Sequence, residues 1–280
     1  MTGSNLINEA TRLLGEDIAE IEPLNGGDLS DVVRLRTASG KTLVAKTGPF
    51  PEREANMLRA MIAGGANAPA PQYASSRLLV LEDLGPSVSP SQNAWRHLAE
   101  ILRALHGTTG ETFGWPEGYA FDRLAIRSTQ DPNWADFWIR NRVLVDTTEL
   151  PDALVQRLEE VEPIIRAVLP ETPAASLLHG DLWTGNVHFT SGDQAHLIDP
   201  ACYYGHFEVD LAMLTLFGSP PQSFWAAYGP LEPGWETRRH IYQLWPALVH
   251  LRLFGAGYLP LVERLLDALG DGSASSFGSS

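Results

Sequence analysis

Short apolar runs that change their period divide the first 85 residues into candidate helices and strands. Residues 5–14 place apolar side chains at helical spacing. Three later runs alternate apolar and polar positions, and the turn signals NGGD and ASGK separate them. These runs cover residues 18–24, 31–38 and 41–47. They predict a small antiparallel sheet.

A second helix is predicted in the segment PEREANMLRAMIAGG, which opens on Pro51 and closes on two glycines. Its apolar side chains lie close to helical spacing and are Ala55, Met57, Leu58, Met61 and Ile62. A buried strand follows within SSRLLVLEDLG, residues 75–85. We therefore expect the helix to dock on the sheet and a first lobe to span residues 1–84.

From residue 91 onward the pattern is mostly helical. The predicted helices cover residues 91–106, 133–146, 152–168, 208–217 and 235–253, the last with a kink at Pro246. Two short strands, residues 186–190 and 194–199, flank the turn SGD. The last ten residues, DGSASSFGSS, have the composition of a disordered tail. A larger, mostly helical lobe is expected over residues 85–270, and disorder over 271–280.

Charge and cysteine content narrow the possible functions. The formal net charge of −14 disfavours partners with a polyanionic surface, so neither nucleic acid nor a membrane is expected as a partner. Cys202 is the only cysteine, which excludes an internal disulfide and a cysteine-rich zinc site. The first twenty residues carry acids where a secretory signal needs a basic flank, and no apolar run is long enough for a membrane span. The cytoplasm is the expected location.

The stretch HGDLWTGN, residues 179–186, concentrates unusual chemistry between two apolar runs. Asp181 and Asn186 have the Asp-x-x-x-x-Asn spacing of the kinase catalytic loop, with His179 two residues before the aspartate. Gly180 allows the backbone to reverse there, because glycine adopts positive φ without a steric penalty. Asp199 ends the second strand of the following hairpin. We predict Asp181 as the catalytic base, and Asn186 and Asp199 as ligands of Mg²⁺.

Lys46 is the candidate phosphate-binding cation. It ends the strand TLVAK, as the lysine of the kinase V-A-I-K strand does. The chain has only two lysines against 18 arginines, so a retained lysine is notable. Glu54, in the first turns of the next helix, is its expected partner, with Glu52 as the alternative. The chain thus predicts a bilobal α+β protein-kinase-like fold.

Two weaker assignments complete a nucleotide site. The turn NGGDLSD supplies Gly26, Gly27 and Asp28 to cover the phosphates, although it lacks the full G-x-G-x-x-G pattern. The residues between the predicted lobes, Glu82, Asp83 and Leu84, are expected to bond the adenine through their backbone.

Other chemistries fit less well. The Gly-Lys-Thr at residues 40–42 is not a Walker loop, because Leu35 stands where glycine is required. The chain has no G-x-S-x-G nucleophile elbow. A metal hydrolase could be drawn from His179, Asp181, His188 and His196, but the last two lie on strands where histidines are common. The two aspartates and the asparagine could also be ordinary turn and cap residues, although their joint order and spacing argue against it.

Three longer stretches carry a family resemblance: LLHGDLWTGNVHF, LIDPACYYGHFEVDLAML and YQLWPALVHLRLFGAGYL. They resemble the fructosamine kinase (ketosamine 3-kinase) family, which is related to aminoglycoside and choline phosphotransferases. The resemblance runs from residue 25 to about residue 265. It implies ATP-dependent phosphorylation of the sugar 3-hydroxyl of a ketoamine, with Mg²⁺ as the second cofactor. The product would be unstable and release the amine, so the implied role is deglycation repair.

The resemblance carries over to individual positions. It implies Asp181 as the base, Asn186 and Asp199 on Mg²⁺, and Lys46 with Glu54 on the phosphates. By position, Trp183 in the loop and Trp245 and His250 on a helix are candidates for contact with the acceptor.

Two departures from the family pattern concern specificity. Asp28 stands where some relatives carry a cysteine, so their redox switching should not transfer. The segment of residues 120–134 is longer and more basic than in relatives, which bears on acceptor preference. A kinase of another small alcohol, such as an aminoglycoside or a choline-like amine, and a nucleotide-binding pseudokinase remain the alternatives. The sequence leaves open the physiological ketoamine, whether it is free or protein-bound, and the oligomeric state.

Overall fold

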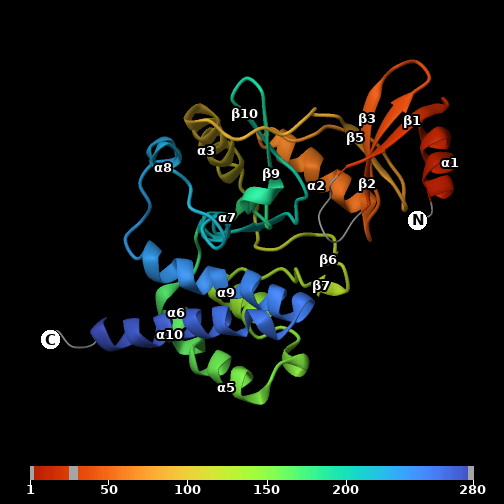
Figure 1. Cartoon of the computed structure of the whole chain (residues 1–280). Helices are drawn as coiled ribbons and strands as arrows, with labels where there is room; N and C mark the ends of the chain where they lie inside the picture. Colours follow the sequence, from red (N-terminus) through yellow and green to blue (C-terminus); the bar gives the residue numbers. More distant parts are fainter. Residues whose placement is uncertain (1–2, 25–30, 277–280) are drawn as a thin grey trace.

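The computed structural model describes the backbone of residues 3–24 and 31–276, and the side chains of residues 5–24 and 31–270. A lobe built on an antiparallel sheet lies beside a larger lobe of helices (Figure 1). The predicted fold class is confirmed. The boundary expected after residue 84 falls in the link between the last strand of the sheet and the first long helix of the second lobe.

Five strands form the sheet, in the order β1-β2-β3-β5-β4, and each neighbouring pair is antiparallel. They are β1 (Ile18–Pro23), β2 (Val32–Thr37), β3 (Thr42–Lys46), β4 (Pro71–Ala74) and β5 (Leu79–Glu82). The sequence did not predict β4, because its prolines indicate a loop. Pro71 is tolerated since β4 is an edge strand, where a backbone N–H is not needed on the outer side.

The two faces of the sheet pack against different helices, and this alternation orients the candidate lysine. Leu43 and Ala45 of β3 belong to the small core beneath α1 (Gly3–Leu14). Val44 and Lys46 point to the opposite face, because successive side chains of a strand alternate. That face carries α2 (Pro51–Ala63), whose buried residues join the main core.

Eight helices are described after residue 85. They are α3 (Gln92–His106), α4 (Trp134–Trp138), α5 (Asp152–Glu160), α6 (Glu162–Val168), α7 (Glu208–Leu214), α8 (Gln222–Tyr228), α9 (Trp235–Phe254) and α10 (Leu259–Ser276). The single helix predicted over residues 152–168 is two, because Pro163 in the first turn of α6 has no backbone N–H with which to continue α5. The helix predicted over residues 208–217 ends at Leu214.

The ends of the last helices also differ from expectation. α9 continues as one helix through Pro246, where the kink stays a prediction. α10 was not predicted, and its backbone runs to Ser276, six residues into the segment expected to be disordered. Residues 277–280 of that segment lie outside the described residues. None of the helices in the described chain has the length and apolar character required to span a membrane.

The helical lobe contains more strands than predicted. The expected hairpin is present as β9 (Val187–Thr190) and β10 (Gln194–Leu197). Two further pairs are β8 (Ser176–Leu178) with β11 (Tyr203–Gly205), and β6 (Tyr119–Phe121) with β7 (Leu124–Ile126). Each of these four strands has only three residues, which is too short to show a period of two in the sequence.

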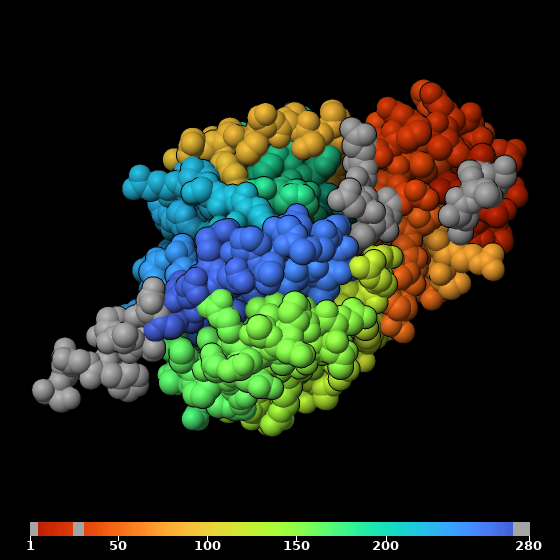
Figure 2. Space-filling model, turned by 60° about the horizontal axis from the view of Figure 1, so that its bottom comes forward, coloured from red at the N-terminus to blue at the C-terminus, as the bar shows by residue number. Residues whose placement is uncertain are grey.

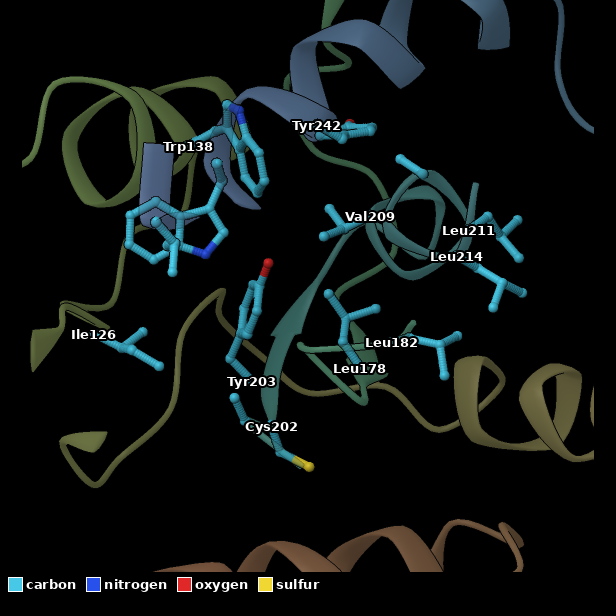
Figure 3. Close-up of a cluster of buried hydrophobic side chains, with 14 of the residues drawn as sticks. Ile126, Trp138, Leu178, Leu182, Cys202, Tyr203, Val209, Leu211, Leu214 and Tyr242 are labelled. Carbon is cyan, nitrogen blue, oxygen red and sulfur yellow. The ribbon is translucent and has the colours of Figure 1, made fainter. Parts of the chain in front are cut away.

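Aromatic side chains fill the core of the helical lobe. Figure 3 shows Tyr203 of β11 with its hydroxyl directed toward the side of Trp138 and Tyr242, while Val209 lies on α7. The rings of Trp138 and Tyr242 meet edge to face at 5.0 Å. Such pairs add to the free energy gained from burial alone. This core supports the paired strands β8 and β11, and the HGDLWTGN loop begins directly after β8.

Candidate active site

The HGDLWTGN loop is held in place by one buried carboxylate. Asp210 of α7 accepts the backbone N–H of His179 at 2.7 Å and that of Gly180 at 2.9 Å. His106, at the end of α3, contacts the same carboxylate at 3.1 Å. Gly180 has a φ of +81°, and a Cβ there would lie 2.0 Å from the carbonyl oxygen of Ala201. The loop therefore requires glycine at this position.

The ring of His179 connects this loop to the strand pair that follows. Its Nε2 donates to the carbonyl of Ile198 at 2.8 Å, and its Nδ1 accepts the N–H of Asp181 at 3.2 Å. Acceptance at Nδ1 requires a neutral imidazole, and burial lowers the pKa of His179 accordingly. His179 thus orients the backbone of Asp181 relative to Asp199, the neighbour of Ile198.

Asp181 and Asn186 form the pair that their spacing predicts. The side-chain amide of Asn186 donates to the backbone carbonyl of Asp181 at 2.8 Å and to its carboxylate at 2.9 Å. Burial raises the pKa of Asp181 to about 7, with the bond from Asn186 acting against the rise and the charges of Asp199 and Asp210 adding to it. A carboxylate with this pKa is suited to accept a proton near neutral pH.

Lys46 lies between two carboxylates that come from different lobes. Its Nζ is 2.8 Å from Oε1 of Glu54 and 2.7 Å from Oδ1 of Asp199. Burial acts to lower the pKa of Lys46, but the two carboxylates raise it above its ordinary value. Asp199 has a φ of +55°, a conformation that residues other than glycine adopt mainly at special sites. The ammonium of Lys46 therefore stays charged, and it connects α2 to Asp199 in the segment that follows β10.

One cavity of about 480 Å³ joins these groups. Its lining includes seven of the residues predicted from the sequence: Lys46, Glu54, Asp181, Trp183, Asn186, Asp199 and His250. The predicted convergence of three oxygen-bearing side chains with one ammonium is present in the structure. Two side chains of this set have oxygen atoms that suit a divalent cation. Asn186 uses its amide nitrogen on Asp181, which leaves its oxygen available, and Asp199 supplies a carboxylate.

A model of the fructosamine kinase family matches residues 3–271. The chain belongs to the fructosamine kinase family. Members of this family are kinases, and the chain is an ATP-dependent phosphotransferase.

Named relatives of this fructosamine kinase family member come from bacteria and plants. The chain is 34% identical over 254 residues to a probable ketoamine kinase of Thermus thermophilus, a match that covers 88% of this chain and 92% of the relative. It is 28% identical over 282 residues to the chloroplastic protein-ribulosamine 3-kinase of Oryza sativa subsp. indica, covering 92% and 80% of the two chains.

Solved structures support the same assignment. A candidate fructosamine-3-kinase of Thermobifida fusca superposes with a TM-score of 0.84 at 29% identity, covering 94% of this chain and 98% of the other. An amicoumacin kinase, at 16% identity, a TM-score of 0.63 and coverage of 97% and 94%, shows the shared fold alone.

Several predicted site residues of this family member lie elsewhere. Trp245 is buried and does not line the cavity; its ring lies 5.1 Å from the guanidinium carbon of Arg142. The backbone N–H of Glu82 donates to the carbonyl of Ala70, just before β4, and its carboxylate accepts the N–H of the same residue.

The other predicted nucleotide contacts stay predictions. The carboxylate of Asp83 accepts a hydrogen bond from Nε of Arg34 at 2.7 Å. Burial acts to raise the pKa of Asp83, but the bond from Arg34 outweighs it, so the pKa is lowered. Neither Asp83 nor Leu84 lines the cavity. Gly26, Gly27 and Asp28 lie outside the described residues.

Sequence reasoning missed a contact between the lobes. Tyr119 of β6 lines the cavity and donates its hydroxyl to Oε2 of Glu54 at 3.4 Å. Arg53 of α2 donates to the carbonyl of Gly118. In Figure 2 the yellow-green surface of this part of the chain borders the orange lobe on one side and the blue helices on the other. The only signal in the sequence was the unusual segment of residues 120–134.

Proposed function

We propose that this protein transfers the γ-phosphoryl group of ATP to the 3-hydroxyl of a ketoamine, a sugar adduct of an amine. The relatives named ketoamine kinase and protein-ribulosamine 3-kinase support this acceptor class. The observation that carries the proposal is the convergence of Asp181, Asn186, Asp199 and Lys46 on one cavity. By the same proposal, the phosphorylated adduct breaks down and releases the amine.

Each group has a distinct part in the transfer. The hydroxyl oxygen of the acceptor attacks the γ-phosphorus, the bond to the bridging oxygen of ADP breaks, and Asp181 takes the hydroxyl proton. Lys46, oriented by Glu54, binds phosphate oxygens as a compact cation. Asn186 and Asp199 would hold Mg²⁺, which supplies neutralisation of the phosphate charge when bound. Most of the catalysis then comes from positioning and charge stabilisation.

The charges around the cavity favour an acceptor that carries a cation. Among the residues that the structure describes, the charged side chains that line the cavity are one base, Lys46, and four acids: Glu54, Asp122, Asp181 and Asp199. Lys46 is already paired with two of the acids. A ketoamine presents a protonated secondary amine close to its sugar hydroxyls, whereas a sugar phosphate would add negative charge to this site. The electrostatic balance therefore supports an amine-bearing acceptor.

The decisive experiment is a phosphorylation assay with ribulosyl-lysine, fructosyl-lysine and glycated protein side by side. Wild-type protein should consume ATP with at least one of them. Asp181→Ala should abolish turnover while nucleotide affinity is retained, and Asp199→Ala should lose Mg²⁺-dependent nucleotide binding measured by calorimetry. Asp193→Ala is the matched control, because this carboxylate lies on the β9–β10 turn and bonds Ser91, away from the cavity.

Other results would overturn the acceptor assignment. Turnover of an aminoglycoside or a choline-like amine, with none of any ketoamine, would make the protein a kinase of another alcohol. ATP binding without turnover of any acceptor would make it a pseudokinase. Near-normal turnover in Asp181→Ala would remove the proposed base.

A further inference from the structure

The cavity has a second wall whose chemistry differs from that of the catalytic groups. Four aromatic rings form it: Phe217 after α7, His250 and Phe254 on α9, and Tyr258 in the short helix η4 (Ala256–Tyr258). His250 is central, with ring centroids 4.8 Å from Phe217, 5.4 Å from Phe254 and 5.0 Å from Tyr258. We call these four residues the aromatic wall.

The aromatic wall keeps apolar surface open inside the cavity. Phe217 is 44% exposed and Phe254 is 47% exposed, and both line the cavity. Large apolar side chains that remain exposed next to polar catalytic groups are typical of a ligand-binding surface. Met213, Val249 and Leu253 extend the same surface with aliphatic side chains.

Few hydrogen-bonding groups are available on this wall. Nδ1 of His250 donates to the carbonyl of Pro246 at 2.7 Å, which leaves Nε2 as an acceptor. Burial lowers the pKa of His250, so the ring is neutral. The hydroxyl of Tyr258 is the other polar side-chain group of the wall. A sugar ring with several hydroxyls would leave most of them unpaired here, at a cost in free energy.

The acidic tip of the β6–β7 hairpin faces the same cavity. Asp122, with a φ of +50°, lies at this tip and lines the cavity with the wall. Arg123 of the hairpin donates to the carbonyl of Arg252 on α9 at 2.9 Å, so hairpin and helix are in contact, as Figure 1 also shows. An acid beside aromatic faces suits a cationic group attached to an apolar chain.

We propose that the aromatic wall binds the amine-side arm of the acceptor, namely the aliphatic stem that leads away from the sugar-bearing nitrogen. The sugar hydroxyls then face Asp181 and the other polar groups, and the methylenes of the stem lie against Phe217 and Phe254. Adducts of amines with a lysine-like stem are therefore preferred over adducts of very short amines or of amines that end in a carboxylate. This inference rests on the proposed function.

The test compares three ribulose ketoamines, made from methylamine, from pentylamine and from 6-aminohexanoate. Full burial of one methylene is worth about a fourfold change in binding. Because the wall covers one side of the stem, we expect kcat/KM for the pentylamine adduct to exceed that for the methylamine adduct about tenfold, mainly through KM. The adduct that ends in a carboxylate should lose most of this advantage.

Phe217→Ala and Phe254→Ala should each reduce the preference for the pentylamine adduct to about twofold or less, because KM for that adduct rises. Both rings are half-exposed, so neither variant should disturb the core, and Phe254→Leu serves as a second variant that retains apolar volume. Tyr73→Ala is the matched control, because this ring is 41% exposed on the remote edge strand β4.

Two results would overturn the inference. An unchanged pentylamine preference in both variants would mean that the wall only packs. An equal loss for both adducts would mean that it holds the sugar itself. Failure of the proposed function is a different outcome, since no ketoamine would then be phosphorylated by the wild-type protein.

Discussion

Tyr119→Phe tests whether the helical lobe helps to orient the lysine–glutamate pair of the sheet lobe. Oε1 of Glu54 accepts a hydrogen bond from Nζ of Lys46 at 2.8 Å, and Oε2 accepts one from the hydroxyl of Tyr119 at 3.4 Å. Burial raises the pKa of Glu54, and both hydrogen bonds oppose that rise. Among the described side chains, Tyr119 is the sole hydrogen-bond partner of Oε2. The substitution thus removes one donor and leaves a buried carboxylate oxygen unpaired.

The expected magnitude follows from this geometry. A hydrogen bond to a charged group contributes about 1.5–3 kcal/mol, and a separation of 3.4 Å places this bond at or below the lower end. A loss of about 1 kcal/mol corresponds to roughly a fivefold change in an equilibrium constant. We expect KM for ATP to rise about fivefold, because Lys46 is less firmly held for the phosphates. The free energy of unfolding should fall by about 1 kcal/mol.

The assay measures initial rates against ATP at saturating acceptor, together with urea unfolding. Tyr73→Phe on the edge strand is the control and should change neither quantity. A double-mutant cycle with Glu54→Gln isolates the contact, because the effect of Tyr119→Phe should largely disappear in that background. An unchanged KM for ATP in Tyr119→Phe, beside a large effect of Glu54→Gln alone, would refute the reasoning.

Three further substitutions probe the loop, the core and the acid response. Gly180→Ala should fail to fold or lose more than about 3 kcal/mol in urea unfolding, because the new Cβ would meet the Ala201 carbonyl at positive φ; wild-type stability would contradict this. Trp245→Ala should lower the free energy of unfolding by about 3–5 kcal/mol, because the ring that packs against Arg142 is lost. KM for the acceptor, measured at low temperature, should stay unchanged. A selective rise in that KM would restore an acceptor role for Trp245. Burial lowers the pKa of His206 to about 3, below the unfolded value of about 6.5. The unfolded state therefore binds more protons below pH 6.5, so the free energy of unfolding falls with the pH, by about 1.4 kcal/mol at pH 5.5. Urea unfolding at pH 7.5 and 5.5 should show a smaller loss for His206→Gln than for the wild-type protein. An equal loss in both would exclude His206 as its source.

The catalytic half of the site could be predicted because its chemistry requires certain residues in a certain order. Asp181 and Asn186 are recognisable from their spacing, and Asp199 from its place at the end of the predicted hairpin. The alternation of side chains along the strand TLVAK directs Lys46 to the face that carries Glu54. These signals are local. They remain readable without knowledge of how the lobes pack.

The acceptor half of the site could not be separated from the core in the same way. Trp245 and His250 lie five residues apart on α9, which is about 140° around a helix. One of them therefore faces Arg142 and the other the cavity, but an apolar helix gives no sign of which. The β6–β7 hairpin was missed because three-residue strands have no readable period.

The division of the cavity between lobes has a consequence for how its specificity can change. The groups proposed for the phosphates, Lys46 and Glu54, belong to the sheet lobe, whereas Phe217 and Phe254 follow or end helices of the other lobe. Replacing side chains at the exposed end of α9 reshapes the pocket for the acceptor and leaves the residues proposed to bind the ATP phosphates unchanged. New acceptors can thus be acquired by point substitutions along a single helix edge, without rebuilding the chemistry of transfer.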